Sequence, residues 1–254
     1  MTQGDPGFPE ACRVVFAEEV ASTNDEARRL LLSGAPAWTV CWARSQSGGR
    51  GRDGRRWSSP PGNLYASLLL RPPGPPAAVA RFAFVAAVAI GSALGSLLPR
   101  GRRVSLKWPN DVLVDGRKVA GILLESEGAR AEGVDGLVVG FGINVASFPA
   151  EARLPATSLR DEGTGDLVPA DVLAACLREL LRWNATWEEA GFAPVREAWM
   201  AAAHGIGAPA LARLPGREVA GIFAGLAESG EMVLDTPDGP RLVSAGDVFF
   251  PSPA

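Results

Sequence analysis

Apolar and polar positions follow two different periods along most of the chain. Short runs that are apolar throughout, or at every second position, predict strands, and longer segments with apolar residues three and four positions apart predict helices. We expect strands at 13–16, 38–43, 64–70, 104–108, 112–114, 119–124 and 137–145. Helices are expected at 23–33, 82–98, 169–189 and 195–203. The stretch 146–167 has neither period and is expected to be a loop.

Beyond Gly205 the pattern changes to short apolar segments separated by Gly, Pro and Asp. Strands are expected at 210–214, 218–224, 232–235, 241–244 and 248–250. Such even spacing is typical of a small barrel. We therefore divide the chain into a first domain at 1–204 and a small barrel at 205–254.

The segment 82–98 carries no charge and contains Gly91-x-x-x-Gly95. It is just short of the roughly 18–20 residues that span a bilayer, and alanine dominates it. Strands are expected on both sides of it in sequence. It is therefore expected to be a buried helix of a globular core.

Composition narrows the class of protein. The 254 residues carry a net charge of −3, without the broad basic excess of a nucleic-acid binder. Cys12, Cys41 and Cys176 are odd in number and far apart, which suits a reducing cytoplasm and predicts neither disulfides nor a His/Cys metal site. Residues 1–10 lack the basic and apolar regions of a signal peptide.

The stretch 48–57 alternates glycines with arginines and ends on Trp57. Glycine lets the backbone approach a ligand, and arginine offers a planar fork of donors to carboxylate or phosphate. The stretch predicts an anion-binding loop, the alternative being a solvated basic loop. Its Gly49-x-Gly51-x-x-Gly54 matches the dinucleotide-binding pattern, but no helix is expected after it, so a Rossmann site is excluded. No Walker A pattern is present.

A second basic cluster comprises 107–112 and 116–122, on either side of the Asp115-Gly116 turn of an expected hairpin. Charges there would lie at the rim of a core, where Coulomb interactions strengthen. The alternative is that they are ordinary turn residues. Earlier in the chain, Thr23 and Glu26 have the spacing of a capping box, so on this pattern alone Ser22 and Thr23 serve the first helix.

Taken together and in order, the arginine loop, the stretch Lys107-Trp108-Pro109-Asn110-Asp111, the stretch 116–122 and Gly142-Ile143-Asn144-Val145 resemble biotin protein ligase. The resemblance covers about 13–250. It implies an α+β fold: a mixed β-sheet with packed helices, followed by an SH3-like barrel. Some relatives carry an amino-terminal helix-turn-helix that represses transcription. Too few residues precede the first strand here for one, so we expect a ligase without repressor function.

The resemblance also implies site residues. On the biotin side it implies Ser22, Thr23, Asn24, Gln46, Arg50, Gly51, Arg52 and Lys118. On the side of ATP and the adenylate it implies Arg52, Trp57, Lys107, Asn110, Lys118 and Asn144. Lys118, Arg52 and Asp111 are the implied catalytic residues, with Asp111 contacting magnesium or handling a proton. Some relatives have a basic residue at the position of Asp53. We expect the Asp53 carboxylate to pair with a neighbouring arginine.

The implied reaction consumes ATP and biotin with Mg²⁺, forms biotinyl-5′-adenylate and pyrophosphate, and transfers biotin to a lysine of a biotin carboxyl carrier protein. Whether the ligase forms a homodimer is left open. A lipoate or octanoate ligase is the nearest alternative, but such enzymes carry a histidine close to an arginine–glycine motif, and His204, expected to be structural, is distant. A non-catalytic module that binds an anion or other ligand is the remaining alternative.

Overall fold

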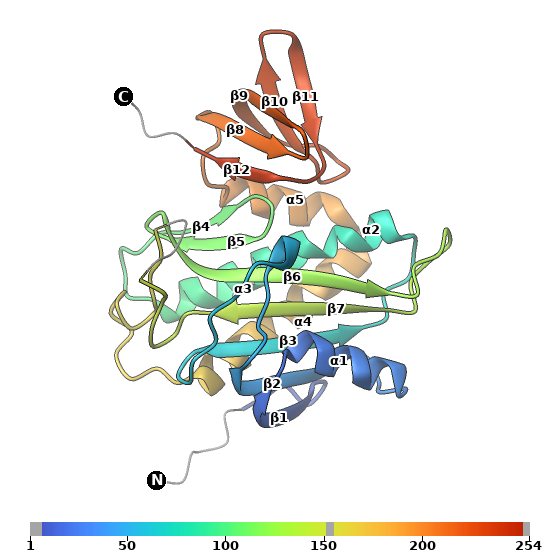
Figure 1. Ribbon diagram of the computed structural model, residues 1–254, viewed down its shortest axis with the longest axis vertical. Helices are drawn as coiled ribbons and strands as arrows, with labels where there is room; N and C mark the ends of the chain where they lie inside the picture. Colours follow the sequence, from blue (N-terminus) through green and yellow to red (C-terminus); the bar gives the residue numbers. More distant parts are fainter. Residues whose placement is uncertain (1–6, 151–154, 251–254) are drawn as a thin grey trace.

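A seven-stranded sheet forms the centre of the computed structural model, which describes residues 7–150 and 155–250 (Figure 1). Its spatial order is β1-β2-β3-β7-β6-β5-β4. The first pair, β1 and β2, is parallel, and the other neighbours are antiparallel. The predicted mixed sheet is therefore confirmed. Its strands are β1 (Arg13–Val20), β2 (Thr39–Gln46), β3 (Leu64–Leu70), β4 (Val104–Lys107), β5 (Asp111–Val114), β6 (Arg117–Glu127) and β7 (Gly136–Ile143).

Helices cover both faces of this sheet. One face carries α1 (Thr23–Leu32), and the other carries α3 (Phe82–Leu97) and α4 (Pro169–Ala190) (Figure 1). Two further helices are α2 (Pro76–Ala80) and α5 (Phe192–Ala201). The central strand β3 is buried along its whole length because both of its faces are covered. Alternate side chains of β3 therefore enter the main core or face α1.

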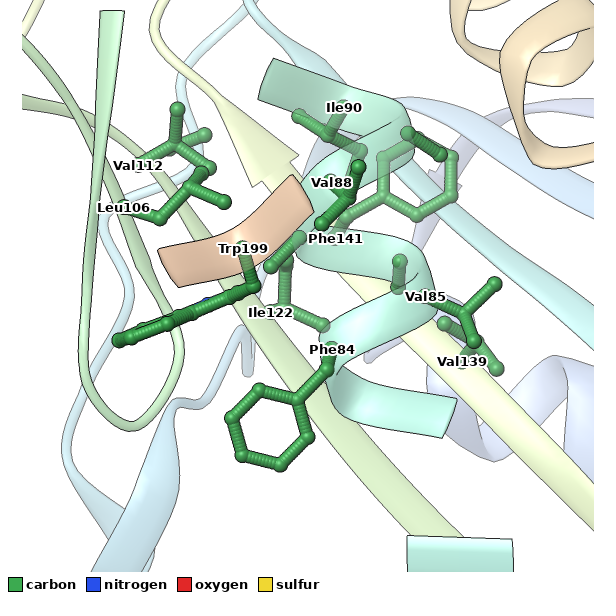
Figure 2. Packing of buried hydrophobic residues seen from close by; sticks show 14 of the residues in the cluster. Phe84, Val85, Val88, Ile90, Leu106, Val112, Ile122, Val139, Phe141 and Trp199 are labelled. Carbon is green, nitrogen blue, oxygen red and sulfur yellow. The ribbon is translucent and has the colours of Figure 1, made fainter. Parts of the chain in front are cut away.

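The uncharged helix α3 lies in the core, as predicted. Gly91 allows close packing, since a Cβ there would lie 3.0 Å from a methyl carbon of Leu106. The stretch Pro76–Leu97 is long and apolar enough to span a membrane, but 61% of its most apolar window is buried inside the protein. Figure 2 shows side chains of α3, among them Phe84, Val85 and Val88, packed with the sheet residues. Its apolar surface is thus used by the core.

The carboxy-terminal strands form one five-stranded antiparallel sheet of order β11-β10-β9-β8-β12. The strands are β8 (Pro209–Leu214), β9 (Arg217–Leu226), β10 (Met232–Thr236), β11 (Gly239–Val243) and β12 (Asp247–Phe249). All five predicted strands are present, but the two outer strands β11 and β12 do not pair, so closure into an SH3-like barrel is not seen. Trp199 of α5 joins this sheet to the rest, because its ring lies 5.7 Å from that of Phe84 and 6.5 Å from that of Phe223. Figure 2 shows Trp199 close to Phe84.

Several local predictions need correction, among them three at the amino-terminal end of the fold. The N-cap of α1 is Ser22, not Thr23, and Ser22 makes no side-chain capping bond. The Thr23 hydroxyl, which was predicted to cap the helix, instead donates to Gln46 and lies 2.8 Å from the Ser67 hydroxyl. Strand β1 continues to Val20, four residues beyond the predicted end, since it pairs with β2 along its length. Strand β2 likewise runs on to Gln46.

The arginine loop does not lead into a helix. Its backbone forms an isolated antiparallel bridge between Arg50 and Arg56, around the single 3-10 turn η1 (Arg52–Gly54). The exclusion of a Rossmann site is therefore confirmed. The predicted loop 146–167 is irregular where it is described, with a parallel bridge from Ala156 to Lys118. Its residues 151–154 lie outside the described part of the chain, as do 1–6 and 251–254.

Candidate active site

A cavity of about 840 Å³ opens between the ends of the central strands, the arginine loop and the carboxy-terminal sheet. Segments far apart in sequence meet there: the start of α1, the end of β2, the β4–β5 turn, β6 and β7. Every residue that the sequence assigned to the site lines this cavity: Ser22, Thr23, Asn24, Gln46, Arg50, Gly51, Arg52, Trp57, Lys107, Asn110, Asp111, Lys118 and Asn144. The individual roles of these residues stay predictions.

Three glycines of the central sheet, Gly121, Gly140 and Gly142, form the floor of the cavity. On β7, Gly140 and Gly142 point to the α1 face of the sheet, with Gly121 beside them on β6. A Cβ at Gly142 would lie 2.5 Å from the indole nitrogen of Trp57, and a Cβ at Gly140 would overlap the side-chain oxygen of Asn24. These glycines therefore make room for side chains of the cavity. Their even spacing along a predicted strand was the signal in the sequence.

Replacing Gly140 by alanine is expected to cost about 1–3 kcal/mol of unfolding free energy, the usual penalty of overpacking. The added methyl must displace Asn24, which is held by hydrogen bonds on either side. Gly133→Ala is the matched control, because its Cβ would have only an ordinary contact with Gly74. Chemical denaturation measures both variants. Equal stabilities would show that Asn24 moves aside freely.

A hydrogen-bond network joins the start of α1 to the neighbouring strands. The Gln46 side-chain oxygen accepts bonds from the Thr23 amide at 2.8 Å and the Thr23 hydroxyl at 3.1 Å. The Gln46 amide nitrogen donates to Ser59 at 2.9 Å. Ser67 of β3, fully buried, lies 2.8 Å from the Thr23 hydroxyl. Ser59 and Ser67 were not predicted, because no local pattern marks a lone serine.

The guanidinium of Arg50 is paired within the protein. It contacts Asp25 at 2.6 and 2.7 Å and both carboxylate oxygens of Glu125 at 3.2 Å. The hydrogen bond to Asp25 is the main reason that the pKa of Arg50 is raised above its ordinary value. Arg50 is thus fully charged and already has two anionic partners.

Two lysines, Lys107 and Lys118, line the cavity close to Asp111. Lys118 lies 2.5 Å from Asp111 and 5.3 Å from the centre of the Trp57 ring. Burial lowers the pKa of Lys107, an effect that Asp111 and Asp247 oppose and that Lys118 and Arg55 reinforce. Both lysines therefore lie in a partly dehydrated region where a phosphate would be held strongly.

The carboxy-terminal sheet also contributes to the wall of the cavity. Asp247, Val248 and Phe249 line it, and none of them was predicted. Arg55 pairs with Asp247 at 2.5 Å, and an Arg52 nitrogen donates to the Gly246 carbonyl at 3.2 Å. The arginine loop is thereby attached to the second sheet. Asp53 pairs with Arg55 at 3.2 Å, which agrees with the expected pairing with a neighbouring arginine.

Asn110 and Asn144, the two asparagines predicted on the ATP side, hold backbone segments together beside the cavity. The Asn110 side chain donates to the Ile122 carbonyl at 2.6 Å, and that of Asn144 donates to the Thr157 carbonyl at 3.0 Å. Thr157 in turn donates to the buried carboxylate of Glu162 at 2.6 Å. These bonds fix the segments that carry Lys118.

Among the described residues, no group of three or more His, Cys, Asp or Glu side chains is arranged to hold a metal ion. Asp111 and Asp247 nevertheless offer carboxylate oxygens to the cavity. Magnesium bound mainly by phosphates and water needs only one or two protein carboxylates, so the residues fit an ion that arrives with a nucleotide. His204 does not line this cavity; its ring packs edge-on against Phe250 at 5.2 Å.

Comparison with known proteins agrees with this geometry. The pattern of the Biotin/lipoate A/B protein ligase family matches residues 16–144, and that of the Biotin protein ligase C terminal domain matches residues 206–250. A biotin–[acetyl-CoA-carboxylase] ligase of Paracoccus denitrificans is 43% identical over 236 residues, which are 90% of this chain and 97% of that protein.

Solved structures of similar fold include biotin protein ligases. A biotin protein ligase from Aquifex aeolicus, in complex with biotin and ATP, has a TM-score of 0.80 and 28% identity, covering 94% of this chain and 99% of that one. One from Leishmania major, in complex with biotinyl-5-AMP, has a TM-score of 0.66 and 27% identity, covering 92% and 99%. Sequence, fold and the residues of the cavity lead to one assignment: the chain belongs to the biotin protein ligase family.

Proposed function

We propose that the protein is an ATP-dependent ligase that activates biotin as biotinyl-5′-adenylate and transfers it to a lysine of a biotin carboxyl carrier protein. The observation that carries this proposal is the single cavity lined by every residue assigned to the site from the sequence. The family membership of the chain supports the same reaction. The name of the Paracoccus relative supports an acetyl-CoA carboxylase as the acceptor.

In the first step, a carboxylate oxygen of biotin attacks the α-phosphorus of ATP. The bond to the β-phosphate oxygen breaks, and pyrophosphate leaves. Two anions must meet in this step, so fixed positive charge in a dry site lowers the barrier. We assign that charge to Lys107, Lys118 and Arg52. Magnesium, when bound, neutralises part of the phosphate charge.

In the second step, the amine of the acceptor lysine attacks the acyl carbon, and the bond to AMP breaks. The amine must first be neutral, although its ordinary pKa is about 10.4, and it loses one further proton as the amide forms. We assign proton transfer to Asp111, a buried carboxylate that lines the cavity beside Lys118. The arginine loop is the cover that keeps water from the mixed anhydride.

We also propose the division at 204/205, a cytoplasmic location and the absence of nucleic-acid and membrane partners. Three buried free cysteines support a reducing compartment, and the net charge of −3 lacks the broad basic excess of a nucleic-acid binder. The unpaired side of β1, an outer strand of the sheet, is available for pairing with another chain. It is the surface we assign to homodimer contact.

Exchange of labelled pyrophosphate into ATP tests the proposed function. Purified protein with magnesium is supplied separately with biotin, lipoate or octanoate. Exchange that depends on biotin alone is the expected result. Exchange with lipoate or octanoate would assign the protein to the sister enzymes, and folded protein without exchange would leave only ligand binding.

Lys107→Met is expected to stabilise the protein while it weakens ATP binding. Methionine keeps an apolar stem but removes a charge that burial disfavours, as the lowered pKa of Lys107 indicates. The KM for ATP should rise by about tenfold, the loss of one charge-assisted contact. Thermal melting and steady-state exchange measure the two effects, and a less stable variant with an unchanged KM would contradict the assignment.

The pH dependence of stability has a definite sign. The folded pKa of Lys107 lies below its ordinary value of 10.5, so between the two values the unfolded chain binds more protons. The unfolding free energy contributed by this residue therefore rises with pH in that interval. Comparing the wild type with Lys107→Met between neutral pH and about pH 10 isolates the contribution.

A further inference from the structure

We propose that Glu125 of β6 is a positioning residue for biotin: it fixes the side-chain amide of Asn24 in one orientation and anchors the arginine loop through Arg50. The proposal rests on the proposed function, in which Asn24 contacts biotin. Glu125 does not itself line the cavity. It therefore acts through its two partners.

The orientation of an asparagine amide follows from its hydrogen-bond partners. An Asn24 nitrogen donates to a Glu125 oxygen at 2.8 Å, and the Ser67 hydroxyl donates to the Asn24 oxygen at 2.6 Å. A carboxylate only accepts, so a flipped amide would set two acceptors against each other. With Asn24 only 4% exposed, water cannot relieve that conflict. The carboxylate of Glu125 thus allows one orientation, and the Ser67 hydroxyl adapts to it by donating.

The sheet surface removes the remaining freedom of this amide. The Asn24 oxygen packs on the backbone of Gly140, where even a single Cβ would overlap it. The amide is therefore fixed by a carboxylate, a hydroxyl and the floor of the cavity. What it presents to a ligand is determined before the ligand arrives, which reduces the cost of ordering on binding.

The other contact of Glu125 is to the loop. Arg50 donates to both oxygens of Glu125 at 3.2 Å and is held from the far side by Asp25. Arg50 also forms the backbone bridge to Arg56 at the base of the loop. Because its guanidinium is satisfied by two carboxylates, we assign Arg50 the role of holding the loop in place rather than of binding the anion. One carboxylate thus connects the biotin pocket to the cover over the adenylate.

Three substitutions test the proposal. Glu125→Gln keeps the shape of the side chain but lets the amide of Asn24 flip and weakens the contact to Arg50. Its side chain is 39% exposed, so the fold is expected to survive. Glu127→Gln is the matched control, because Glu127 lies on the same strand and pairs with Arg28 of α1 without touching Asn24 or Arg50. Asp25→Asn weakens the ion pair with Arg50 and leaves the hydrogen bond between Glu125 and Asn24 in place.

Biotin binding without ATP, measured by calorimetry, separates these roles. For Glu125→Gln we expect a rise in the biotin Kd of about tenfold, the usual effect of losing one charge-assisted hydrogen bond. In exchange assays its biotin KM should rise while the rate at saturating biotin and the KM for ATP stay near wild type. Glu127→Gln should match the wild type. Asp25→Asn should release adenylate faster, as Glu125→Gln does, with a much smaller rise in Kd.

An unchanged biotin Kd in Glu125→Gln would overturn the positioning role. So would equal rises in Glu125→Gln and Asp25→Asn, since Glu125 would then act only through Arg50. Glu125→Ala, which removes the carboxylate altogether, must reproduce the rise. The wild-type protein tests the proposed function separately. If it shows biotin-dependent pyrophosphate exchange, that function stands whatever the Glu125 variants do. If it shows no exchange, the proposed function itself is rejected.

Discussion

Lys118→Ala should lose adenylate formation, with a fall of about 10²–10³-fold in the biotin-dependent exchange rate. Its ammonium lies in the partly dehydrated region shared with Asp111 and Trp57, where the charge of the reacting phosphate would develop. Without it, the buried carboxylate of Asp111 is left unpaired and repels the phosphates. Pyrophosphate exchange measures the loss, and calorimetric titration shows whether biotin still binds.

The double variant Lys118→Ala with Asp111→Asn is the control for this prediction. It removes the stranded negative charge as well as the lysine. If transition-state stabilisation by Lys118 is the cause, the double variant stays inactive in the first step. Recovery of a near wild-type exchange rate would show that the single variant fails only because of the unpaired Asp111.

Arg52→Ala is expected to release biotinyl-5′-adenylate into solution, about 10–100-fold faster than wild type, the range for one lost hydrogen bond to a charged group. Arg52 lies at the cavity and donates to the Gly246 carbonyl of the carboxy-terminal sheet. Removing it takes away one attachment of the loop that covers the intermediate. The free mixed anhydride should then biotinylate bystander proteins.

Chromatography of the adenylate after rapid filtration, and labelling of an added unrelated protein, measure this release. Arg44→Ala is the matched control, because Arg44 is an exposed arginine of β2 that pairs with Glu18 and does not line the cavity. An Arg52→Ala protein that retains its intermediate as the wild type does would rule out the covering role of Arg52.

The predicted elements were largely confirmed because their signals are local. Strand β3 occupies the predicted residues 64–70, and the predicted hairpin turns at Asp115-Gly116 between β5 and β6. The N-cap of α1 was predicted at Thr23, one residue after the observed Ser22. The Thr23 hydroxyl contacts Gln46 and Ser67, which lie far from it in sequence. The barrel predicted for the carboxy-terminal strands is not seen to close, since closure depends on pairing between strands and not on the propensity of each strand.

The candidate site was predictable to a similar degree. Residues that fall in ordered motifs, such as Lys118 and Asn144, all line the cavity. Glu125 and Asp247 were missed because their partners lie far along the chain: Asn24 is 101 residues from Glu125, and Arg55 is 192 residues from Asp247. A single carboxylate in a strand or turn gives no local signal of such a contact.

The sequence by itself determined the elements, the fold class and the family, because periodicity and the order of motifs are properties of neighbouring residues. Only the tertiary structure decided how the charges of the site are used. Arg50 forms ion pairs with Asp25 and Glu125, and Arg55 forms one with Asp247. Ion pairs depend on distance in space, which the folded sheets set and the linear pattern does not contain.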